Sequence, residues 1–222
     1  VNVSTLVYVG ANEGVSLWGL IEHFDEVHVF EPDPEIFAKL KKRYQQFEWV
    51  TLNNAACSDK DGESSFFVTN NRVASSLGAG SEEFQGFGDY NKVMKEVTVK
   101  TINLSKYLEE KGIEDIDLYY SDCQGSDLTV LNTIKEWVDA GKIKEIFTET
   151  HNNGRLLYEG LDNQFEGFVK ILSKNYDFIH ASLGCEQARL VGAEDIPDSN
   201  PEFDSYWRLK NNPPGIGIHL RA

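Results

Sequence analysis

Short apolar runs alternate with amphipathic stretches along most of the 222 residues, which limits the chain to folds built from strand–helix units. The runs Leu6–Val9 and Val27–Phe30 have the length and composition of strands buried on both faces. Between them, about Val15 to Phe24, apolar residues recur at helical spacing, and Asp33 followed by Pro34 signals the start of another helix. The pattern predicts an α/β fold, a three-layer sandwich with a mostly parallel sheet.

The remaining elements follow from the same patterns. Further strands are predicted at Trp49–Leu52, Ser64–Val68, Val97–Thr101, Ile116–Tyr120, Ile143–Thr148, Phe178–Ala181 and Ile216–Leu220. Further helices are predicted at Leu104–Lys111, after Ser126, and across Phe165 to Leu172, and the polar stretch Asn70–Asn91 is predicted to be a loop. No good amphipathic helix separates the last two strands, so we expect an antiparallel strand near the C-terminus, at the edge region of the sheet.

Length and charge limit the number of domains and the classes of binding partner. We expect one domain over residues 1–222, and because the chain begins without Met we expect a processed product or a piece of a longer chain. A formal charge of −15 disfavours nucleic acid and anionic lipid as partners, and no apolar run reaches the roughly 20 residues of a membrane span. Three widely spaced cysteines fit neither a disulfide framework nor a zinc site, which predicts a reducing, cytoplasmic setting.

Two motifs predict an adenosine-containing ligand. The turn Gly10–Gly14 (Gly-Ala-Asn-Glu-Gly) follows the first strand, where small residues let a ligand approach the backbone at a helix N-terminus. Glu31, followed by Pro32, ends the second strand, where a carboxylate can accept hydrogen bonds from both hydroxyls of a ribose. Asn54 and Ala55 end the third strand, where we expect the base: Asn54 to pair with its edge and Ala55 to leave room for a flat ring.

Polar side chains also follow the fourth and fifth core strands. Asp122 and Gln124 come after the fourth strand, and Glu149, His151 and Asn152 come after the fifth. Ligands of open α/β sheets bind at the carboxyl ends of the strands, so we expect these side chains to converge on one crevice.

In this order, these blocks resemble the FkbM family of methyltransferases. The resemblance covers most of the chain, from Val7 to about Asn152, and its motifs lie in Gly10–Gly14, Phe30–Pro34, Asn54–Gly62, Ala74–Leu77 and Asp122–Gly125. It implies a class I methyltransferase (Rossmann-like) sheet, S-adenosylmethionine (SAM) as methyl donor, and oxygen methylation of a sugar, a glycan or a related small molecule. It also implies that other domains of a longer glycan-modifying chain are candidate partners.

Two positions depart from the family pattern. Tyr8 stands where the family usually has Asp, which removes a carboxylate expected near the methionine part of the donor, and Gln124 stands where it usually has Glu. The cofactor-binding residues expected on these grounds are Gly10, Ala11, Asn12, Gly14, Glu31, Pro32, Asn54, Ala55, Asp122 and Gln124.

Methyl transfer to an alcohol needs a base and in-line positioning of the acceptor. The candidate catalytic residues are Asp122, His151 and Glu149, with Asp122 or His151 as general base. A second interpretation uses Asp122, Glu149 and Asn152 as oxygen ligands of Mg²⁺, Mn²⁺ or Ca²⁺, which would acidify the acceptor hydroxyl.

Other function classes stay open. A nicotinamide-dependent oxidoreductase also needs a Gly-rich turn and an acid after the second strand, although the Gly-x-x-x-Gly spacing lacks the Gly-x-Gly-x-x-Gly fingerprint. A binding module that keeps the fold without turnover is the non-enzyme alternative, because of Tyr8 and Gln124. The aromatic residues expected in loops, as platforms for sugar rings, as lids or as satellite core, are Phe84, Phe87, Tyr90, Tyr158, Tyr206 and Trp207.

Overall fold

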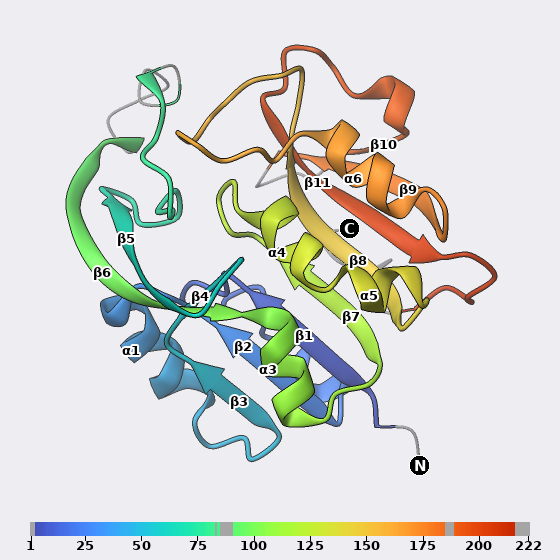
Figure 1. Ribbon diagram of the computed structural model, residues 1–222, viewed down its shortest axis with the longest axis horizontal. Coiled ribbons are helices and arrows are strands. Elements are labelled where there is room, and N and C mark those ends of the chain that lie inside the picture. Colours follow the sequence, from blue (N-terminus) through green and yellow to red (C-terminus); the bar gives the residue numbers. More distant parts are fainter. Residues whose placement is uncertain (1–2, 83, 85–90, 185–188, 216–222) are drawn as a thin grey trace.

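A computed structural model describes residues 3–82, 84, 91–184 and 189–215 (Figure 1). Its centre is an eight-stranded sheet in the order β10-β9-β11-β8-β7-β1-β2-β3. The strands are β1 Thr5–Val9, β2 Glu26–Phe30, β3 Val50–Asn53, β7 Ile116–Ser121, β8 Ile143–His151, β9 Tyr176–Leu183, β10 Arg189–Val191 and β11 Glu202–Leu209. Strands predicted from apolar runs therefore form most of this sheet.

The C-terminal side of the sheet corrects the prediction of which strand runs antiparallel. The pairs β1–β2, β1–β7, β2–β3 and β7–β8 are parallel, whereas β11 runs antiparallel to both β8 and β9. An antiparallel arrangement near the C-terminus is confirmed, but the reversed strands are β11, inside the sheet, and β10, at its edge, neither of which the sequence pattern singled out. Polar Asp204 and Ser205 interrupt the apolar residues of β11, so it lacks the pattern of a buried strand. The predicted strand Ile216–Leu220 lies outside the described residues.

A second, three-stranded sheet flanks the first. It consists of β4 (Ala56–Ser58), β5 (Gly62–Thr69) and β6 (Val93–Asn103), with β5 and β6 antiparallel and β4 parallel to β6. These strands include the predicted ranges Ser64–Val68 and Val97–Thr101. The long β5 and β6 ribbons curve away from the main sheet beside its β1–β3 side (Figure 1).

Local capping signals explain two helices. The Asp33 carboxylate accepts the backbone N–H groups of Glu35 and Ile36 at the start of α1 (Pro34–Tyr44). Helix α3 (Leu104–Lys111) ends where Gly112 adopts a left-handed φ of 69°. Helix α1 begins where the sequence predicts, and α3 has both of its predicted bounds.

Two other helix predictions are wrong in detail. The segment predicted as a helix over Val15–Phe24 contains only the 3₁₀ turn η1 (Ile21–His23), because Gly19 has a φ of 87° that interrupts the helix. The helix after Ser126 is divided into α4 (Asp127–Thr133) and α5 (Lys135–Asp139), and the Ser126 hydroxyl makes no capping hydrogen bond. Helix α6 (Phe165–Leu172) and the 3₁₀ turn η3 (Ala193–Asp195) follow towards the C-terminus.

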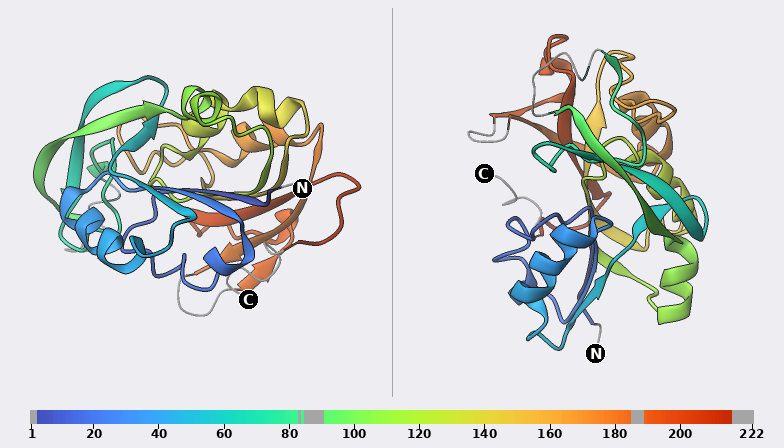
Figure 2. Two further views of the ribbon diagram at one scale, coloured as in Figure 1. Left: turned by 90° about the horizontal axis from the view of Figure 1, so that it is seen from below. Right: turned by 90° about the vertical axis from the view of Figure 1, so that its left-hand side faces the viewer.

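The sheet separates two apolar cores. On one face, Val7, Val9 and Tyr119 pack with residues of α3 to α6, and on the other face Leu6 and Tyr8 pack with residues of η1 and α1. Figure 2 shows the corresponding layers, with α1 on one side of the sheet and α3 to α5 on the other. Within the described part of the chain, no helix combines the length and apolarity needed to cross a membrane.

Candidate active site

A cavity of about 1210 Å³ opens at the carboxyl ends of the central strands. Its wall includes residues from the turn after β1, the end of β2, the loop after β7, and strands β8, β9 and β11. Residues 71–75 and Leu77 of the loop after β5 close another side. The cavity therefore occupies the place at which the sequence predicts a ligand.

The turn after β1 begins with a close contact between two loops. Gly10 has a φ of 77°, and a Cβ added to it would lie 1.9 Å from the carbonyl oxygen of Asp122. The backbone N–H groups of Gly10 and Ala11 both donate to the carbonyl of Phe30, at 3.0 and 3.1 Å. This position accepts only glycine, because a side chain would push apart the loops after β1 and β7.

The other end of the turn packs on helix α1. Gly14 has a φ of 76°, and an added Cβ would lie 2.5 Å from the Tyr44 ring and 2.7 Å from Leu40. The Tyr44 hydroxyl donates to the Gly14 carbonyl at 2.5 Å. Asn12, between the glycines, also has a positive φ, of 50°. The turn is thus held by β2 on one side and α1 on the other.

Glu31 lies at the end of β2 and faces the cavity. The backbone N–H of Asn12 donates to its Oε2 and the backbone N–H of Asp33 to its Oε1, both at 2.8 Å. Only 6% of the residue is exposed, and this burial raises the pKa of Glu31 to about 7 against the opposing effect of the two backbone hydrogen bonds. The carboxylate is fixed at the position predicted for a ribose contact, beside Pro32 in the cavity wall.

The residues after β3 divide between two roles. Ala55 and Ala56 line the cavity. The Asn54 amide nitrogen instead donates to the carbonyls of Glu31 and Pro32, at 2.8 and 3.1 Å, and Asn54 is outside the cavity wall. The predicted pairing of Asn54 with a base edge is therefore replaced by a role in holding the loop after β2.

Gln124 connects the ends of β7 and β8. Its side-chain nitrogen donates to Asp122 Oδ1 at 2.6 Å and to Glu149 Oε1 at 2.7 Å. Its side-chain oxygen accepts from the Tyr158 hydroxyl, and its backbone carbonyl accepts from the Ser76 hydroxyl, both at 2.5 Å. The structure thus brings together Asp122, Gln124 and Glu149, as predicted, and the amide at the position where the family usually has Glu can donate to both carboxyl groups.

Glu149 is buried but incompletely paired. Its exposed fraction is 6%, it lies in the cavity wall, and its Oε2 has no hydrogen-bond partner. Burial raises the pKa of Glu149 well above its usual range, and the nearby carboxyl groups of Asp122 and Glu202 raise it further. A buried acceptor of this kind needs a partner that a ligand can supply.

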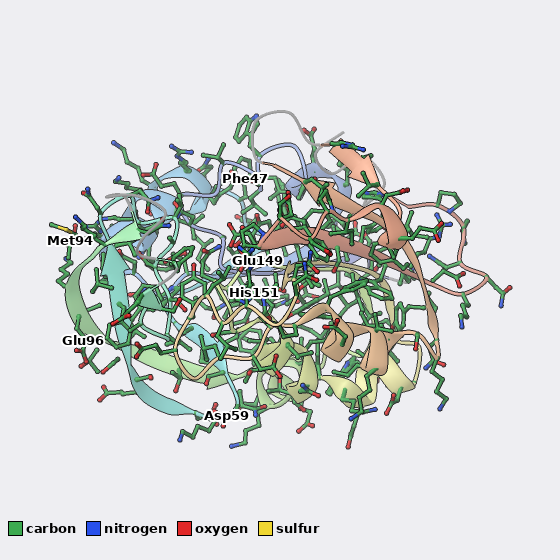
Figure 3. The ribbon with its side chains drawn as sticks, turned by 90° about the horizontal axis from the view of Figure 1, so that it is seen from above. Phe47, Asp59, Met94, Glu96, Glu149 and His151 are labelled. Carbon is green, nitrogen blue, oxygen red and sulfur yellow. The ribbon has the colours of Figure 1, made fainter. Side chains whose placement is uncertain are left out.

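His151 does not reach the predicted crevice. Strand β8 continues through His151, and its side chain lies fully buried against Tyr158, with ring centroids 5.9 Å apart. Neither ring nitrogen has a hydrogen-bond partner, and burial lowers the pKa of His151 to about 4. Glu149 and His151 both lie near the centre of the molecule in Figure 3, but only Glu149 is in the cavity wall. The position of His151 corrects its candidacy as general base.

The predicted metal ligands are not assembled. The Asn152 amide donates to the Pro197 carbonyl at 3.2 Å, and Asn152 is not part of the cavity wall. Within the described ranges, no group of three or more His, Cys, Asp or Glu side chains is arranged to hold a metal ion. The oxygen set of Asp122, Glu149 and Asn152 therefore does not fit a divalent cation.

The sequence pattern missed the far wall of the cavity. Ser182 of β9 and Glu202 and Asp204 of β11 line it. Asp204 is the sheet partner of both Ser182 and Glu149, so these side chains form one cross-strand row. Polar residues within strands that the sheet buries were the available signal, but it could not be used before β11 was known to pair between β8 and β9.

Most of the aromatic residues expected in loops are in the core. Tyr206 and Trp207 belong to β11 and are buried, and Phe84 packs against Tyr158 with ring centroids 4.9 Å apart. Tyr8 stacks on Tyr120 at 4.1 Å, in the cavity wall. Phe87 and Tyr90 lie outside the described residues.

The strand order, the reversed β11 and the cavity at the strand ends define a class I methyltransferase fold. The sequence profile of the methyltransferase FkbM domain matches residues 9–179. The chain belongs to the FkbM methyltransferase family.

One curated relative is the 2-O-methyltransferase NoeI of Sinorhizobium fredii, 26% identical over 160 residues that cover 68% of this chain and 64% of the relative. The match therefore spans less than two thirds of that relative. Among solved structures, a Streptococcus mutans methyltransferase in complex with SAH is similar with a TM-score of 0.47 and 11% identity, covering 93% of this chain and 88% of that one. The N-methyltransferase NodS of Bradyrhizobium japonicum has a TM-score of 0.47 and 9% identity, covering 93% and 86%.

Proposed function

We propose that this protein transfers a methyl group from SAM to a hydroxyl group of a sugar or glycan. The observation that carries the proposal is the position of Glu31: two backbone N–H groups hold its carboxylate at the end of β2, in the same cavity as Asp122. A carboxylate there can accept both hydroxyls of a ribose. The family supports methyl transfer, and the 2-O-methyltransferase relative supports oxygen as the acceptor atom.

The residues that line the cavity fit SAM, the proposed methyl donor. Gly10, Ala11 and Asn12 line the cavity without bulky side chains, Ala55 leaves room for a flat ring, and Glu31 lies in the same wall. SAM, when bound, supplies a methyl group on a positively charged sulfur. Asp122, at the end of β7, places a carboxyl group close to that region of the cavity.

Asp122 is the proposed general base. The Gln124 amide holds its Oδ1, so the carboxylate is oriented before the acceptor binds. Asp122 takes the acceptor hydroxyl proton as the new O–CH₃ bond forms and the S–CH₃ bond breaks. Most of the rate enhancement then comes from holding the acceptor oxygen in line with the breaking bond. His151 has no part in this step, because Tyr158 covers it.

The test uses labelled SAM and a panel of glycans, followed by mass spectrometry to locate the methyl group. The proposal expects label on an oxygen of at least one acceptor, and it expects S-adenosylhomocysteine (SAH) to raise the melting temperature. SAH binding without transfer to any acceptor would favour a binding module instead. Stabilisation by NAD and not by SAH would favour the oxidoreductase alternative.

The cellular setting is proposed separately. Among the described residues, Cys57 and Cys123 are free thiols. Free thiols are typical of reducing compartments, which supports a cytoplasmic location.

A further inference from the structure

The far wall of the cavity carries acidic groups that the donor site does not use. Glu149 of β8 and Asp204 of β11 are sheet partners, Ser182 of β9 pairs with Asp204 on its other side, and Glu202 lies two residues before Asp204. All four line the cavity. We call this group the acidic wall.

Three oxygens in the acidic wall lack partners. Glu149 Oε2, Glu202 Oε2 and Ser182 Oγ are buried atoms without a hydrogen bond, and Ser182 is only 1% exposed. Unpaired buried polar atoms are rare in native proteins, and a group of them at one wall of a cavity indicates a missing ligand. A ligand that supplies donors satisfies all three atoms, because ionised carboxylate oxygens accept hydrogen bonds and a hydroxyl oxygen can also accept.

Charge narrows the choice of ligand. Arg72 is the only Lys or Arg in the described cavity wall, and its guanidinium bonds to Asp33 and Glu35, which are not in the wall. Among the described residues, no Lys or Arg of the cavity wall pairs with Glu149 or Glu202. Burial, with repulsion from Asp122, raises the pKa of Glu202 to about 7, which reflects how poorly the wall tolerates its own charge.

From this geometry we infer that the acidic wall binds a protonated amine on the acceptor, so that the acceptor is an amino sugar or another hydroxyl-bearing amine. An ammonium group has three donors and no acceptor, which matches the three unpartnered oxygens, and it places a positive charge beside Glu149 and Glu202. The inference rests on the proposed function, because it names the acceptor class of the same site. Asp122 follows β7, which lies between β8 of the acidic wall and the β1–β2 side that carries Glu31. The Gln124 amide bonds to both Asp122 and Glu149, so an amine held by the acidic wall places the acceptor next to Asp122.

Calorimetric titration with matched acceptors tests this inference. The methyl glycosides of glucosamine and galactosamine are compared with their N-acetyl counterparts, in the presence of saturating SAH and excess EDTA. SAH fills the donor end of the cavity, by which we mean the Gly10–Gly14 turn and Glu31. EDTA prevents a divalent ion from binding at the acidic wall. We expect at least one amine to bind about tenfold or more tightly than its N-acetyl partner. Equal affinities, or no binding by either amine, would overturn the inference.

Two variants and one control locate the preference. Glu202→Gln and Ser182→Ala should remove most of the preference for the amine while SAH affinity, which reports folding, stays within about twofold. Glu194→Gln changes an exposed acid of η3 outside the cavity and should keep the preference. A preference that survives Glu202→Gln would place the amine elsewhere and contradict the inference.

The same samples separate this inference from the proposed function. Methyl transfer to neutral sugars as readily as to amines would leave the proposed function intact and overturn the inference. Preferential amine binding with no transfer to any acceptor would support the acidic wall and overturn the proposed function.

Discussion

The two ends of the cavity differ in how completely the protein satisfies its own polar groups. At the donor end, both oxygens of Glu31 accept backbone N–H groups, and Gly10 is held against the loop after β7. At the acidic wall, Glu149 Oε2 and Ser182 Oγ have no partner. The difference teaches that the donor end is organised before its ligand arrives, whereas the acidic wall is completed by its ligand.

Gly10→Ala should have the largest effect on stability and SAH binding, because it places a side chain inside the donor end of the cavity. The added Cβ would meet the Asp122 carbonyl at 1.9 Å, and the left-handed backbone adds strain. We expect a loss of about 3 kcal/mol in the free energy of unfolding and no measurable SAH binding. The control is Gly19→Ala, with a φ of 87° but no atom within 4 Å, which should cost about 1–2 kcal/mol and keep SAH binding. Equal effects of the two variants would show that the close contact is unimportant.

Asp122→Asn should leave the donor end intact and stop the chemistry. Asn keeps the oxygen that accepts from Gln124 but cannot take a proton. The rate of methyl transfer should fall roughly 10²- to 10⁴-fold with little change in SAH affinity. His151→Phe is the companion variant: its ring can still stack on Tyr158, and neither nitrogen it removes is hydrogen-bonded. Loss of activity in His151→Phe with normal stability would return the base role to His151.

Glu31→Gln should weaken SAH binding about 100-fold. Glu31 accepts a backbone N–H at each oxygen, and the Gln side chain would set its own NH₂ against one of them. Calorimetry of SAH binding measures the effect. Glu22→Gln, at an exposed acid of η1, serves as the control and should bind SAH normally. An unchanged affinity in Glu31→Gln would remove the ribose contact from the proposed site.

The pKa of Glu31 predicts opposite pH trends for stability and binding. Burial raises this pKa from 4.5 to about 7, so its contribution to stability is complete below pH 4.5 and is lost as the pH rises through 7. The loss is on the order of 3 kcal/mol. SAH affinity should rise over the same window, because the carboxylate is the form that accepts both ribose hydroxyls. Glu31→Gln should remove the trend in SAH affinity and part of the trend in stability. If stability and SAH affinity changed in the same direction with pH, the assignment of this pKa to Glu31 as the ribose contact would be contradicted.

Chelation of divalent metal ions should leave the rate of methyl transfer unchanged. The described residues assemble no metal-binding group, and the Asn152 amide is used by the Pro197 carbonyl. Methyl transfer measured after exhaustive treatment with EDTA should therefore equal the untreated rate. A loss of activity that Mg²⁺, Mn²⁺ or Ca²⁺ restores would show that the acidic wall takes a metal ion in place of an amine.

The sequence alone determined the features that depend on neighbouring residues. The Asp33 cap, the stop at Gly112 and the glycines of the Gly10–Gly14 turn are local, since backbone conformation and capping involve only a few consecutive residues. The position of Glu31 at a strand end followed for the same reason. These signals were sufficient for the fold class, the family resemblance and the donor end.

Only the tertiary structure determined which residues form the acidic wall. Glu149, Asp204 and Ser182 form one row because β11 pairs between β8 and β9, and no local pattern specifies which distant strands pair. Use of the Asn54 amide by the carbonyls of the loop after β2 is also a long-range contact, and covering of His151 by Tyr158 depends on how the segment after β8 folds back. Residue type showed which groups could act, but burial and partners selected those that face the cavity.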